Sequence, residues 1–519
     1  MRIGIDVGGT HTDAVLMRDA EVISATKALT SANVSDGILN ALETILSDSG
    51  VSETEVEAVM LGTTQFTNAV IERRELADVA AIRIGLPSGR GLPPKVGWPE
   101  DIDAAMGGHA YLLPGGFLYD GRELSGFDEG AAMRVADDIA ARKISAASIA
   151  SAFSPMNAGP ETRMAELLRA RVPGIRITES HRIGRLGLLE RENAAMLNSA
   201  LLPFADRVVD SFATALKARG LTCPFFVSQN DGTLMDAEFV RQFPALTFAS
   251  GPTNSLRGAA RLTGLENAIV VDIGGTTSDI GVLQDGFPRE SNVVIEVGGV
   301  RTNFRMPDIL AIGLGGGSLV SEDGGTIGPR SVGHNLVTEG LIFGGSKLTT
   351  TDIVVAAGRE QVGDRARVES LDDEIVARAL TTIMDMLNVG IEKMKPSSKP
   401  LPVVLVGGGA LLVTEKPEAA LELHRPEHAG VANAIGAAIA QIGGEAERLV
   451  SYTEIPRDEA IEAVSREAVE LAALAGARRE TIKIADIDET TLSYMDEGST
   501  KLRVKAVGDI AVLEATCDS

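Results

Sequence analysis

An eight-residue phrase that occurs twice constrains the fold of this chain more than any other sequence feature. The first copy occupies residues 6–13 and the second residues 272–279, and both read Asp-x-Gly-Gly-Thr-x-x-Asp. An apolar run precedes each copy and another follows it, so each copy predicts a strand, a tight glycine turn and a second strand. Two such units in distant parts of the chain indicate two similar half-molecules that each offer a loop to one shared ligand.

The residue types in this phrase suit the binding of a phosphate and its metal. Adjacent glycines let the backbone turn sharply and bring N–H groups close to a ligand, threonine adds hydroxyl donors, and aspartate can hold a cation. A single copy would be explained equally well by an ordinary hairpin turn. The repetition favours the phosphate-binding interpretation.

Composition limits the class of protein and its partners. The 519 residues predict two to four domains, and 48 Lys and Arg against 72 Asp and Glu give a formal net charge of −24. This charge disfavours nucleic acid and anionic membranes as partners. Two cysteines provide no disulfide framework, the residues before Asp6 leave no room for a signal peptide, and no apolar run is long enough to span a membrane. We therefore expect a soluble, cytoplasmic protein.

Three further loops have the form expected near an anion. A strand at residues 56–61 leads into Gly62-Thr63-Thr64 and then a helix, which aims helix N-terminal amides at a ligand. A plain N-cap by Thr64 explains that loop equally well. A strand at residues 308–312 leads into the glycine loop at 313–318, and a strand at residues 401–406 leads into three glycines at 407–409.

Several other kinds of site do not fit the sequence. The loop at residues 313–318 matches the dinucleotide fingerprint only in part, and residues 340–347 lack the Gly-Lys-Ser/Thr ending of a P-loop. Pro426 lies between His424 and His428 and disfavours the helix that would align them on a metal. No nucleophile elbow or activated cysteine is present. The phosphate-loop interpretation therefore has no competitor among these motifs.

Taken together, the motifs resemble the actin, heat-shock chaperone and sugar-kinase superfamily, and more specifically the hydantoinase A and oxoprolinase family. The segments that carry this resemblance follow the family's order: residues 4–13, 62–68, 191–201, 244–260, 271–283 and 308–318. The resemblance implies an α/β fold of two ribonuclease H-like lobes, of the actin and hexokinase type, around a nucleotide cleft. We expect the first lobe at residues 1–185, the second at 186–430, and a small C-terminal α/β unit at 446–519. A helix at residues 431–445 should pack back on the first lobe, and this helix and the one after Gly187 should connect the lobes.

The resemblance also assigns site residues. ATP and Mg²⁺ are the implied cofactors, with Asp6 and Asp272 as metal and catalytic residues and Asp13 and Asp279 as candidate general bases. The implied nucleotide-binding residues are Gly8, Gly9, Thr10, His11 and Thr12 in the first loop, Gly274, Gly275, Thr276 and Thr277 in the second, and Gly407, Gly408 and Gly409 near adenosine. The substrate is expected between the lobes, near Thr63, Thr64, Asn68, Gly315, Gly316, Gly317 and Ser318.

The implied reaction is the ATP-dependent opening of a cyclic amide such as a hydantoin, oxoproline or another lactam. Phosphorylation of the carbonyl oxygen weakens donation from nitrogen and installs a leaving group, which requires positioning and charge neutralisation more than a protein nucleophile. The family further implies a second subunit of the hydantoinase B type, or another neighbour-encoded protein, that completes hydrolysis. The identity of the substrate and the oligomeric state, a homo-oligomer included, stay open.

Two other functions fit the same fold. One is a small-molecule kinase or an ATP-dependent carboxylase subunit, which would give a stable phosphorylated or carboxylated product. The other is a nucleotide-switched binding protein that opens and closes its lobes without turnover. The sequence departs from the family pattern at two positions: His11 stands where the family usually has Phe, and Leu61 where it has His. These departures leave ATP binding better supported than the identity of the substrate.

Overall fold

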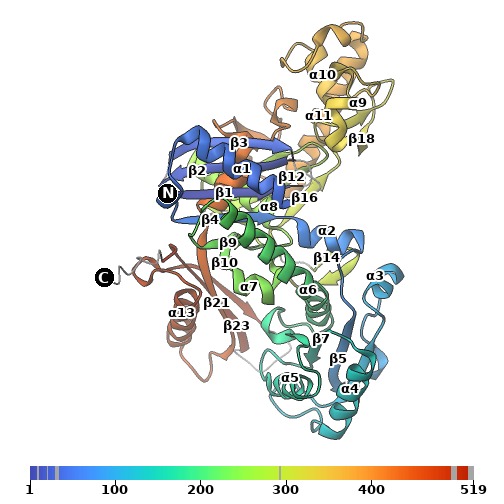
Figure 1. The fold of residues 1–519 in the computed structure, drawn as a ribbon, viewed down its shortest axis with the longest axis vertical. Helices are drawn as coiled ribbons and strands as arrows, with labels where there is room; N and C mark the ends of the chain where they lie inside the picture. The colour runs from blue at the N-terminus through green and yellow to red at the C-terminus, as the bar shows by residue number, and fades with distance from the viewer. Residues whose placement is uncertain (9–10, 20, 30–33, 292–293, 493–498, 512–519) are drawn as a thin grey trace.

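The computed structural model describes residues 1–519 apart from residues 9–10, 20, 30–33, 292–293, 493–498 and 512–519. Figure 1 shows an elongated α/β molecule, with helices α10 and α11 at one end and α4 and α5 at the other. Three sheets of four or more strands organise the described residues. Two of these sheets contain the repeated phrase.

The larger of these two sheets has nine strands, in the order β22-β23-β21-β10-β9-β4-β1-β2-β3. The hairpin β1–β2 is antiparallel, and β4 and β9 continue the sheet parallel to β1. The strand bounds are Arg2–Val7 (β1), His11–Arg18 (β2), Glu21–Leu29 (β3), Ala58–Thr63 (β4), Phe225–Ser228 (β9), Thr233–Asp236 (β10), Gln441–Ser451 (β21), Lys483–Thr491 (β22) and Ser499–Gly508 (β23).

The second sheet repeats this plan in a shorter form, with the order β13-β12-β11-β19-β20 and β16 paired to β12. Its hairpin β11–β12 is antiparallel, and β19 runs parallel to β11 as β4 does to β1. The bounds are Ala268–Ile273 (β11), Ser278–Gln284 (β12), Phe287–Pro288 (β13), Ile309–Ile312 (β16), Leu401–Val406 (β19) and Ala420–His424 (β20).

The two hairpins match each other residue by residue. Asp6 is the register partner of Asp13, and Asp272 is the partner of Asp279. The turns close with equivalent hydrogen bonds, from Gly8 N–H to the His11 carbonyl (3.0 Å) and from Gly274 N–H to the Thr277 carbonyl (2.9 Å). The predicted strand, glycine turn and strand are therefore present in both copies, although Gly9 and Thr10 lie outside the described residues.

A four-stranded parallel sheet, in the order β6-β5-β7-β8, lies between β4 and β9 in the chain. Its strands are Val79–Leu86 (β5), Ala110–Pro114 (β6), Ala146–Ser151 (β7) and Arg176–Glu179 (β8). Residues 1–185 thus supply strands to two sheets, and the first sheet also takes strands from later in the chain. The domain boundaries expected at residues 185 and 445 stay a prediction.

Helices cover these sheets and link them. They are α1 (Val34–Ser49), α2 (Gln65–Glu72), α3 (Glu100–Ala105), α4 (Glu129–Arg142), α5 (Gly159–Arg171), α6 (Leu188–Ala218), α7 (Ala237–Gln242), α8 (Ser250–Thr263), α9 (Leu336–Glu339), α10 (Thr350–Ala356), α11 (Asp373–Met394), α12 (Ala432–Ala438) and α13 (Arg457–Leu474). Helix α6 packs on β7 and β8, whereas α11 packs on β12 and β16.

Helices α8 and α12 connect the two hairpin sheets. Helix α12 contacts β1, β2 and β4, while α8 contacts β11, β12 and β19, and the two helices pack against each other. A Cβ at Gly258 would collide with the Ala432 carbonyl, and one at Gly436 with the Asn254 carbonyl. These glycines let the helix backbones touch. Helix α8 thus lies beside α12, and the expectation that the helix after Gly187, which is α6, also connects the lobes stays a prediction.

The C-terminal residues form an α/β unit in which α13 packs on β21 and β23. Strand β21 also pairs with β10, so this unit continues the first sheet. The helix expected to reach residue 445 ends at Ala438, and a strand begins at Gln441. The alternation of more and less buried residues along β21 explains the difference, because a strand presents successive side chains to opposite faces.

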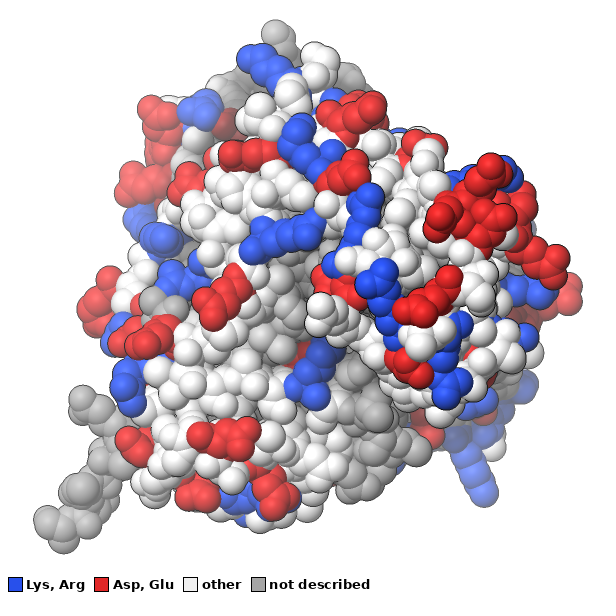
Figure 2. Space-filling model, turned by 90° about the horizontal axis from the view of Figure 1, so that it is seen from above, with Lys and Arg blue, Asp and Glu red and all other residues white. Residues whose placement is uncertain are grey.

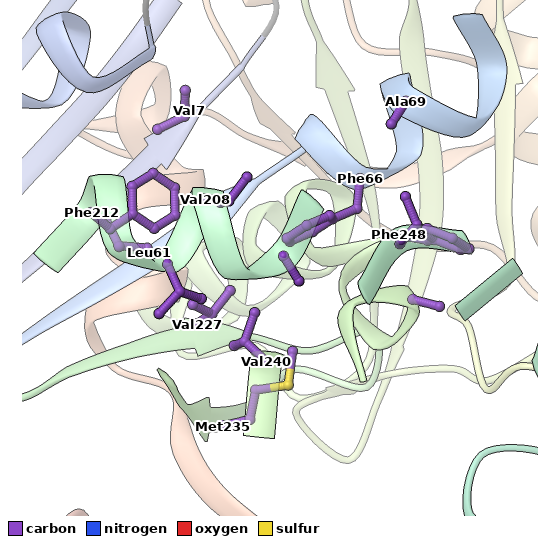
Figure 3. Packing of buried hydrophobic residues seen from close by; sticks show 14 of the residues in the cluster. Val7, Leu61, Phe66, Ala69, Val208, Phe212, Val227, Met235, Val240 and Phe248 are labelled. Atoms are coloured by element: carbon purple, nitrogen blue, oxygen red, sulfur yellow. The ribbon is translucent and has the colours of Figure 1, made fainter. Parts of the chain in front are cut away.

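A buried apolar cluster fixes the start of α2, which follows Thr63 and Thr64. Figure 3 shows Phe66 of α2 among Val208 and Phe212 of α6, Leu61 of β4 and Phe248. The ring of Phe66 meets that of Phe204 edge to face, with centroids 5.6 Å apart. This close packing of aromatic rings therefore fixes the position of the loop between β4 and α2.

Acidic and basic side chains are interspersed on the face seen from above in Figure 2. Among the described residues, no helix combines the length and the apolar character needed to cross a bilayer.

The contact between α8 and α12 can be tested with one methyl group. Replacing Gly436 with Ala should lower the free energy of unfolding by about 1–3 kcal/mol, because the added Cβ forces the helices apart. Gly430→Ala is the matched control, since a Cβ there meets no atom within 4 Å. Urea unfolding followed by circular dichroism measures both. Equal stability of the two variants would contradict the close contact.

Candidate active site

The first hairpin carries a buried pair of carboxylates. Asp6 and Asp13 are 5% and 3% exposed, and as directly opposed residues they share one face of the hairpin. Asn433 of α12 bridges them: its Nδ2 donates to Asp6 Oδ2 at 2.9 Å and to Asp13 Oδ2 at 3.0 Å. Lys27 Nζ donates to both oxygens of Asp13 at 2.8 Å and to the Gly430 carbonyl at 3.1 Å. A cation and an amide therefore hold Asp13, whereas among the described residues Asp6 has neutral amides only, those of Asn433 and Asn254.

Asp6 keeps one oxygen uncommitted. Its Oδ1 is buried and has no hydrogen-bond partner among the described residues. The oxygen lies against Gly62, where a Cβ would collide with it. Burial, together with the nearby charge of Asp13, raises the pKa of Asp6 to about 7. The neutral amide of Asn254 lies beside this oxygen and lowers the pKa of Asp6, but no cation in the described part of the chain does, so the oxygen is available to a cation or to a water bound to one.

The second hairpin repeats this arrangement with different partners. Ser255 of α8 donates its hydroxyl to Asp272 Oδ2, and burial raises the pKa of Asp272. Burial and the charge of Asp272 raise the pKa of Asp279 to about 7. Gly407 lies against Asp272 as Gly62 lies against Asp6, because a Cβ at Gly407 would collide with Asp272 Oδ1. Each half thus uses a glycine to leave room for its aspartate.

The glycine loop at residues 313–318 packs on the second hairpin turn. The N–H groups of Gly316 and Gly317 donate to the carbonyls of Gly274 (3.0 Å) and Gly275 (2.7 Å). Gly315 N–H donates to the hydroxyl of Ser318 at 2.9 Å, and Ser318 is buried. These amides are used within the protein, so the loop braces the phosphate loop. Thr276 and Thr277 are exposed at its tip.

The residues expected near the substrate in the first half gather at its hairpin turn. Thr64 donates its hydroxyl to the Val7 carbonyl at 3.4 Å, and Asn68 Nδ2 donates to Thr64 Oγ1 at 3.5 Å. Ser250, at the start of α8, donates to the Thr63 carbonyl at 3.2 Å. Thr64 makes no side-chain cap bond to α2. Thr64 therefore stands at the N-cap position of α2 without capping it through its side chain, and its ligand role stays a prediction.

The glycines at residues 407–409 join the two halves. Gly409 N–H donates to the Ile273 carbonyl at 2.7 Å, and a Cβ at Gly408 would lie 3.7 Å from Lys27 Cε. Lys27 lies in β3 of the first sheet and Gly408 follows β19 of the second, so the two halves approach each other at this point. His11 is half-buried near this point, and burial followed by the charge of Lys27 lowers its pKa.

Comparison with known proteins now decides the family. A family model described as the hydantoinase/oxoprolinase N-terminal region matches residues 2–172, and a second model, described as hydantoinase/oxoprolinase, matches residues 191–397. This chain belongs to the hydantoinase/oxoprolinase family. The resemblance inferred from the ordered motifs is thereby confirmed.

Relatives of the hydantoinase/oxoprolinase chain include two enzyme subunits. The alpha subunit of caprolactamase from Pseudomonas jessenii is 28% identical over 389 residues, which cover 69% of this chain and 54% of that protein. The gamma subunit of acetophenone carboxylase from Aromatoleum aromaticum is 26% identical over 399 residues, which cover 69% of this chain and 53% of that protein. The chain spans about half the length of these curated relatives.

Solved structures confirm the fold class. The crystal structure of the ATP-dependent caprolactamase from Pseudomonas jessenii aligns with a TM-score of 0.80 at 19% identity, covering 98% of this chain and 88% of that one. A nucleotide-free acetone carboxylase aligns with a TM-score of 0.67 at 18% identity, covering 99% and 88%. The hydantoinase/oxoprolinase chain thus has the two-lobed α/β fold with the C-terminal unit that we expected.

The hydantoinase/oxoprolinase site fits magnesium held by few protein ligands. In the part of the chain that the structure describes, no three His, Cys, Asp or Glu side chains gather into a metal cage. Mg²⁺ is commonly held by one or two carboxylates, with waters and substrate phosphates completing its octahedron. Asp6, with Oδ1 uncommitted, and Asp272 are the carboxylates that would hold it, and the charge of Asp272 contributes to the raised pKa of Asp6.

Three residues that contact the aspartates were absent from the sequence-based set: Lys27, Asn433 and Ser255, which donates to Asp272. Lys27 lies in β3 and Asn433 in α12. Both contact Asp13, from which they are separated in the sequence by 14 and 420 residues. The structure also separates the two candidate bases: Asp13 is paired with Lys27 and Asn433, whereas Asp279 has no hydrogen-bond or ion-pair partner among the described residues. The choice of general base between Asp13 and Asp279 stays a prediction.

The raised pKa of Asp6 gives a pH dependence of stability. Between pH 4 and pH 7 the folded chain holds a proton that the unfolded chain releases, so the free energy of unfolding falls as pH rises across this range. Asparagine does not ionise, so Asp6→Asn should not lose stability as the pH rises. At pH 8 its free energy of unfolding should exceed that of the parent by about 2–4 kcal/mol, with a smaller difference at pH 5. Urea unfolding without metal or nucleotide measures this. The exposed Asp48→Asn is the control, and parallel pH profiles for Asp6→Asn and the parent would contradict the assignment.

The bridge from Asn433 should support nucleotide binding. Asn433→Ala leaves the paired oxygens of Asp6 and Asp13 without a donor, so the carboxylates repel each other and lose their orientation. A hydrogen bond to a charged group contributes about 1.5–3 kcal/mol. We expect the affinity for MgATP to fall roughly tenfold or more, as measured by calorimetry. The exposed Asn40→Ala on α1 should bind like the parent, and unchanged binding by Asn433→Ala would remove the bridge from the site.

Proposed function

We propose that this chain is an ATP-dependent hydrolase subunit that phosphorylates the carbonyl oxygen of a cyclic amide, such as a hydantoin, oxoproline or another lactam, to drive ring opening. The observation that carries this proposal is the pair of matched hairpins, with their aspartates opposed and Asp6 Oδ1 uncommitted. Membership of the hydantoinase/oxoprolinase family and similarity to a caprolactamase subunit support the substrate class.

In this proposal the two hairpin turns hold the phosphates of ATP between them. Thr276 and Thr277 are exposed at the second tip and offer hydroxyl donors. Lys27 lies at the junction of the halves and supplies positive charge. Mg²⁺, when bound, neutralises charge on the phosphates and fixes their orientation. Gly407–Gly409 would pass close to the nucleoside, where their lack of side chains leaves room.

The chemistry begins with attack of the amide carbonyl oxygen on the terminal phosphorus of ATP, as the phosphorus–oxygen bond to ADP breaks. Resonance donation from nitrogen makes an amide carbonyl a poor electrophile, and O-phosphorylation weakens that donation. Water then adds to the carbonyl carbon and the carbon–nitrogen bond breaks with proton transfer to nitrogen, which leaves an acyl phosphate. A second water hydrolyses this acyl phosphate to carboxylate and phosphate. Positioning and electrostatic stabilisation supply most of the rate acceleration in such transfers. In this proposal Asp279 would accept the N–H proton that the amide loses when its carbonyl oxygen is phosphorylated.

We propose a second candidate function because two relatives are carboxylases: this chain could serve as the ATP-dependent subunit of a carboxylase. The same carbonyl phosphorylation would then activate a substrate for carbon–carbon bond formation. Both relatives are named as subunits, which supports the proposal that this chain also acts with a partner protein. A nucleotide-switched binding protein would instead bind ATP tightly without turnover.

An ADP-release assay tests the proposed function. The chain, alone and with a neighbour-encoded subunit, is incubated with MgATP and a panel containing hydantoin, 5-oxoproline and caprolactam, and ADP and ring-opened product are measured. We expect stimulation of ADP release by at least one cyclic amide. Asp272→Asn should reduce that turnover roughly 100-fold or more while changing stability little, because it removes charge at the phosphate loop. Stimulation only by a ketone with bicarbonate would favour the carboxylase, and the absence of stimulated ADP release in every combination would refute both enzymes.

A further inference from the structure

Asn254 of helix α8 is a buried polar residue whose side chain makes no hydrogen bond. It is 0% exposed, and within the described residues neither Oδ1 nor Nδ2 has a hydrogen-bond partner. The large majority of buried side-chain polar atoms in proteins do have one, because an unpaired buried amide costs stability. An amide that is kept in this state marks a place where a polar ligand can bind.

The side chain of Asn254 faces the uncommitted oxygen of Asp6. A Cβ on Gly62 would lie 2.2 Å from Asp6 Oδ1 and 2.6 Å from Asn254 Nδ2, so both atoms border one small space beside this glycine. Asp6 Oδ1 is itself buried without a hydrogen bond in the described chain. Two acceptor oxygens and one amide nitrogen, all unpaired, therefore gather at the first hairpin.

The backbone around Asn254 is held firmly. Its carbonyl lies against α12, because a Cβ on Gly436 would come within 1.8 Å of that oxygen. The preceding residue, Thr253, donates its hydroxyl to the Asn230 carbonyl at 2.8 Å. Contacts on both sides thus fix the start of the Asn254 side chain, and its amide is directed at Asp6 before any ligand arrives.

Consecutive residues of α8 serve the two hairpins. Asn254 faces Asp6, whereas Ser255 donates its hydroxyl to Asp272 Oδ2. Neighbouring side chains on a helix point about 100° apart, so one turn of α8 reaches a carboxylate on each side of the cleft. Asp6 and Asp272 are the two carboxylates that would hold Mg²⁺.

A water molecule bound to a metal ion matches the unpaired atoms. Its oxygen uses a lone pair on the metal, and its two hydrogens remain to be donated. Asp6 Oδ1 and Asn254 Oδ1 are two buried acceptors without a donor among the described residues. Mg²⁺ usually keeps several waters when a protein offers it only one or two carboxylates. Groups that bind such ligands from outside orient them and raise the affinity for the metal.

We propose that Asn254 is a positioning residue for the magnesium–nucleotide complex. Its amide oxygen and Asp6 Oδ1 each accept a hydrogen bond from one water of the hydrated magnesium ion, while Ser255 orients Asp272 toward the same ion. This inference rests on the proposed function in one respect, the binding of MgATP between the hairpins. It assigns the ordering of the metal's water shell to one turn of α8.

The contribution of the metal to ATP binding tests this role. ATP affinity is measured by displacement of a fluorescent ATP analogue, once with excess Mg²⁺ and once with EDTA, and the ratio of the two affinities is the metal's contribution. Asn254→Ala removes the amide oxygen, so we expect this ratio to fall roughly tenfold, with metal-free ATP bound within about twofold of the parent. An unchanged ratio would overturn the role. Equal losses with and without Mg²⁺ would also overturn it, because they indicate general damage to the site.

Asn254→Asp is the conservative variant. Aspartate keeps an acceptor oxygen at the same distance along the side chain, so the metal's contribution should be at least that of the parent. The added negative charge should weaken the binding of metal-free ATP. A ratio as low as that of Asn254→Ala would overturn the assignment of the role to the amide oxygen.

Asn198 of α6 is the matched control, because it is equally buried but hydrogen-bonded. Its Nδ2 donates to Thr178 Oγ1 at 3.0 Å and to the Gln242 carbonyl at 2.8 Å, and its Oδ1 accepts from Ala245 N–H at 3.2 Å. Without metal and nucleotide, Asn198→Ala should unfold at a lower urea concentration than the parent, whereas Asn254→Ala should not. Asn198→Ala should keep the parental ratio of ATP affinities. A larger loss of stability in Asn254→Ala would show that its amide is paired within the protein and would overturn the inference.

Two results separate this inference from the proposed function. If the parent binds no ATP with or without Mg²⁺, the proposed function fails before Asn254 is tested. If the parent binds MgATP and a cyclic amide stimulates turnover, but Asn254→Ala keeps the parental ratio of affinities, only the role of Asn254 is overturned.

Discussion

Burial of two like-charged carboxylates on one face of a hairpin is the constraint around which this molecule is built. Asp6 and Asp13 are opposed in register and nearly inaccessible, so their charges repel each other in a poorly solvated place. Two groups offset this repulsion: the ammonium group of Lys27 in β3 and the side-chain amide of Asn433 in α12. Because Asn433 lies on α12, the first hairpin is complete only when that helix is docked, and docking requires the glycine contacts between α12 and α8.

The same contacts connect the two halves of the site. Helix α8 begins beside Thr63, supplies Ser255 to Asp272, and packs on α12, which supplies Asn433 to Asp6. A shift between α8 and α12 therefore changes the surroundings of both aspartates together. Small residues at this contact leave few interlocking side chains to resist sliding, so the pair is suited to transmit movement between the lobes. The orientation of the carboxylates in both hairpins therefore depends on one pair of packed helices.

The sequence predicted the local parts of this site and missed the contacts between distant segments. The hairpins were predictable because glycine turns between apolar runs have a local signature, and the family resemblance supplied the two-lobed fold. Lys27, Asn433 and Ser255 have ordinary local surroundings, and only tertiary packing brings them to the aspartates. The error at residues 439–445 has the same origin, because runs of small residues fit a helix or a strand and pairing of β21 with β10 and β23 decides for the strand.

The charge of the site favours joint binding of nucleotide and metal. Four aspartates line the two hairpins, and a bare polyphosphate would meet their repulsion. The pKa values of about 7 for Asp6 and Asp279 show how strongly the site resists more negative charge. A divalent cation on Asp6 and Asp272 would reverse this balance, because it neutralises the carboxylates and attracts the phosphates at once. Lys27 cannot do this alone, since its charge is already shared with Asp13. In the proposed function, the site would therefore bind a metal–nucleotide complex rather than free ATP.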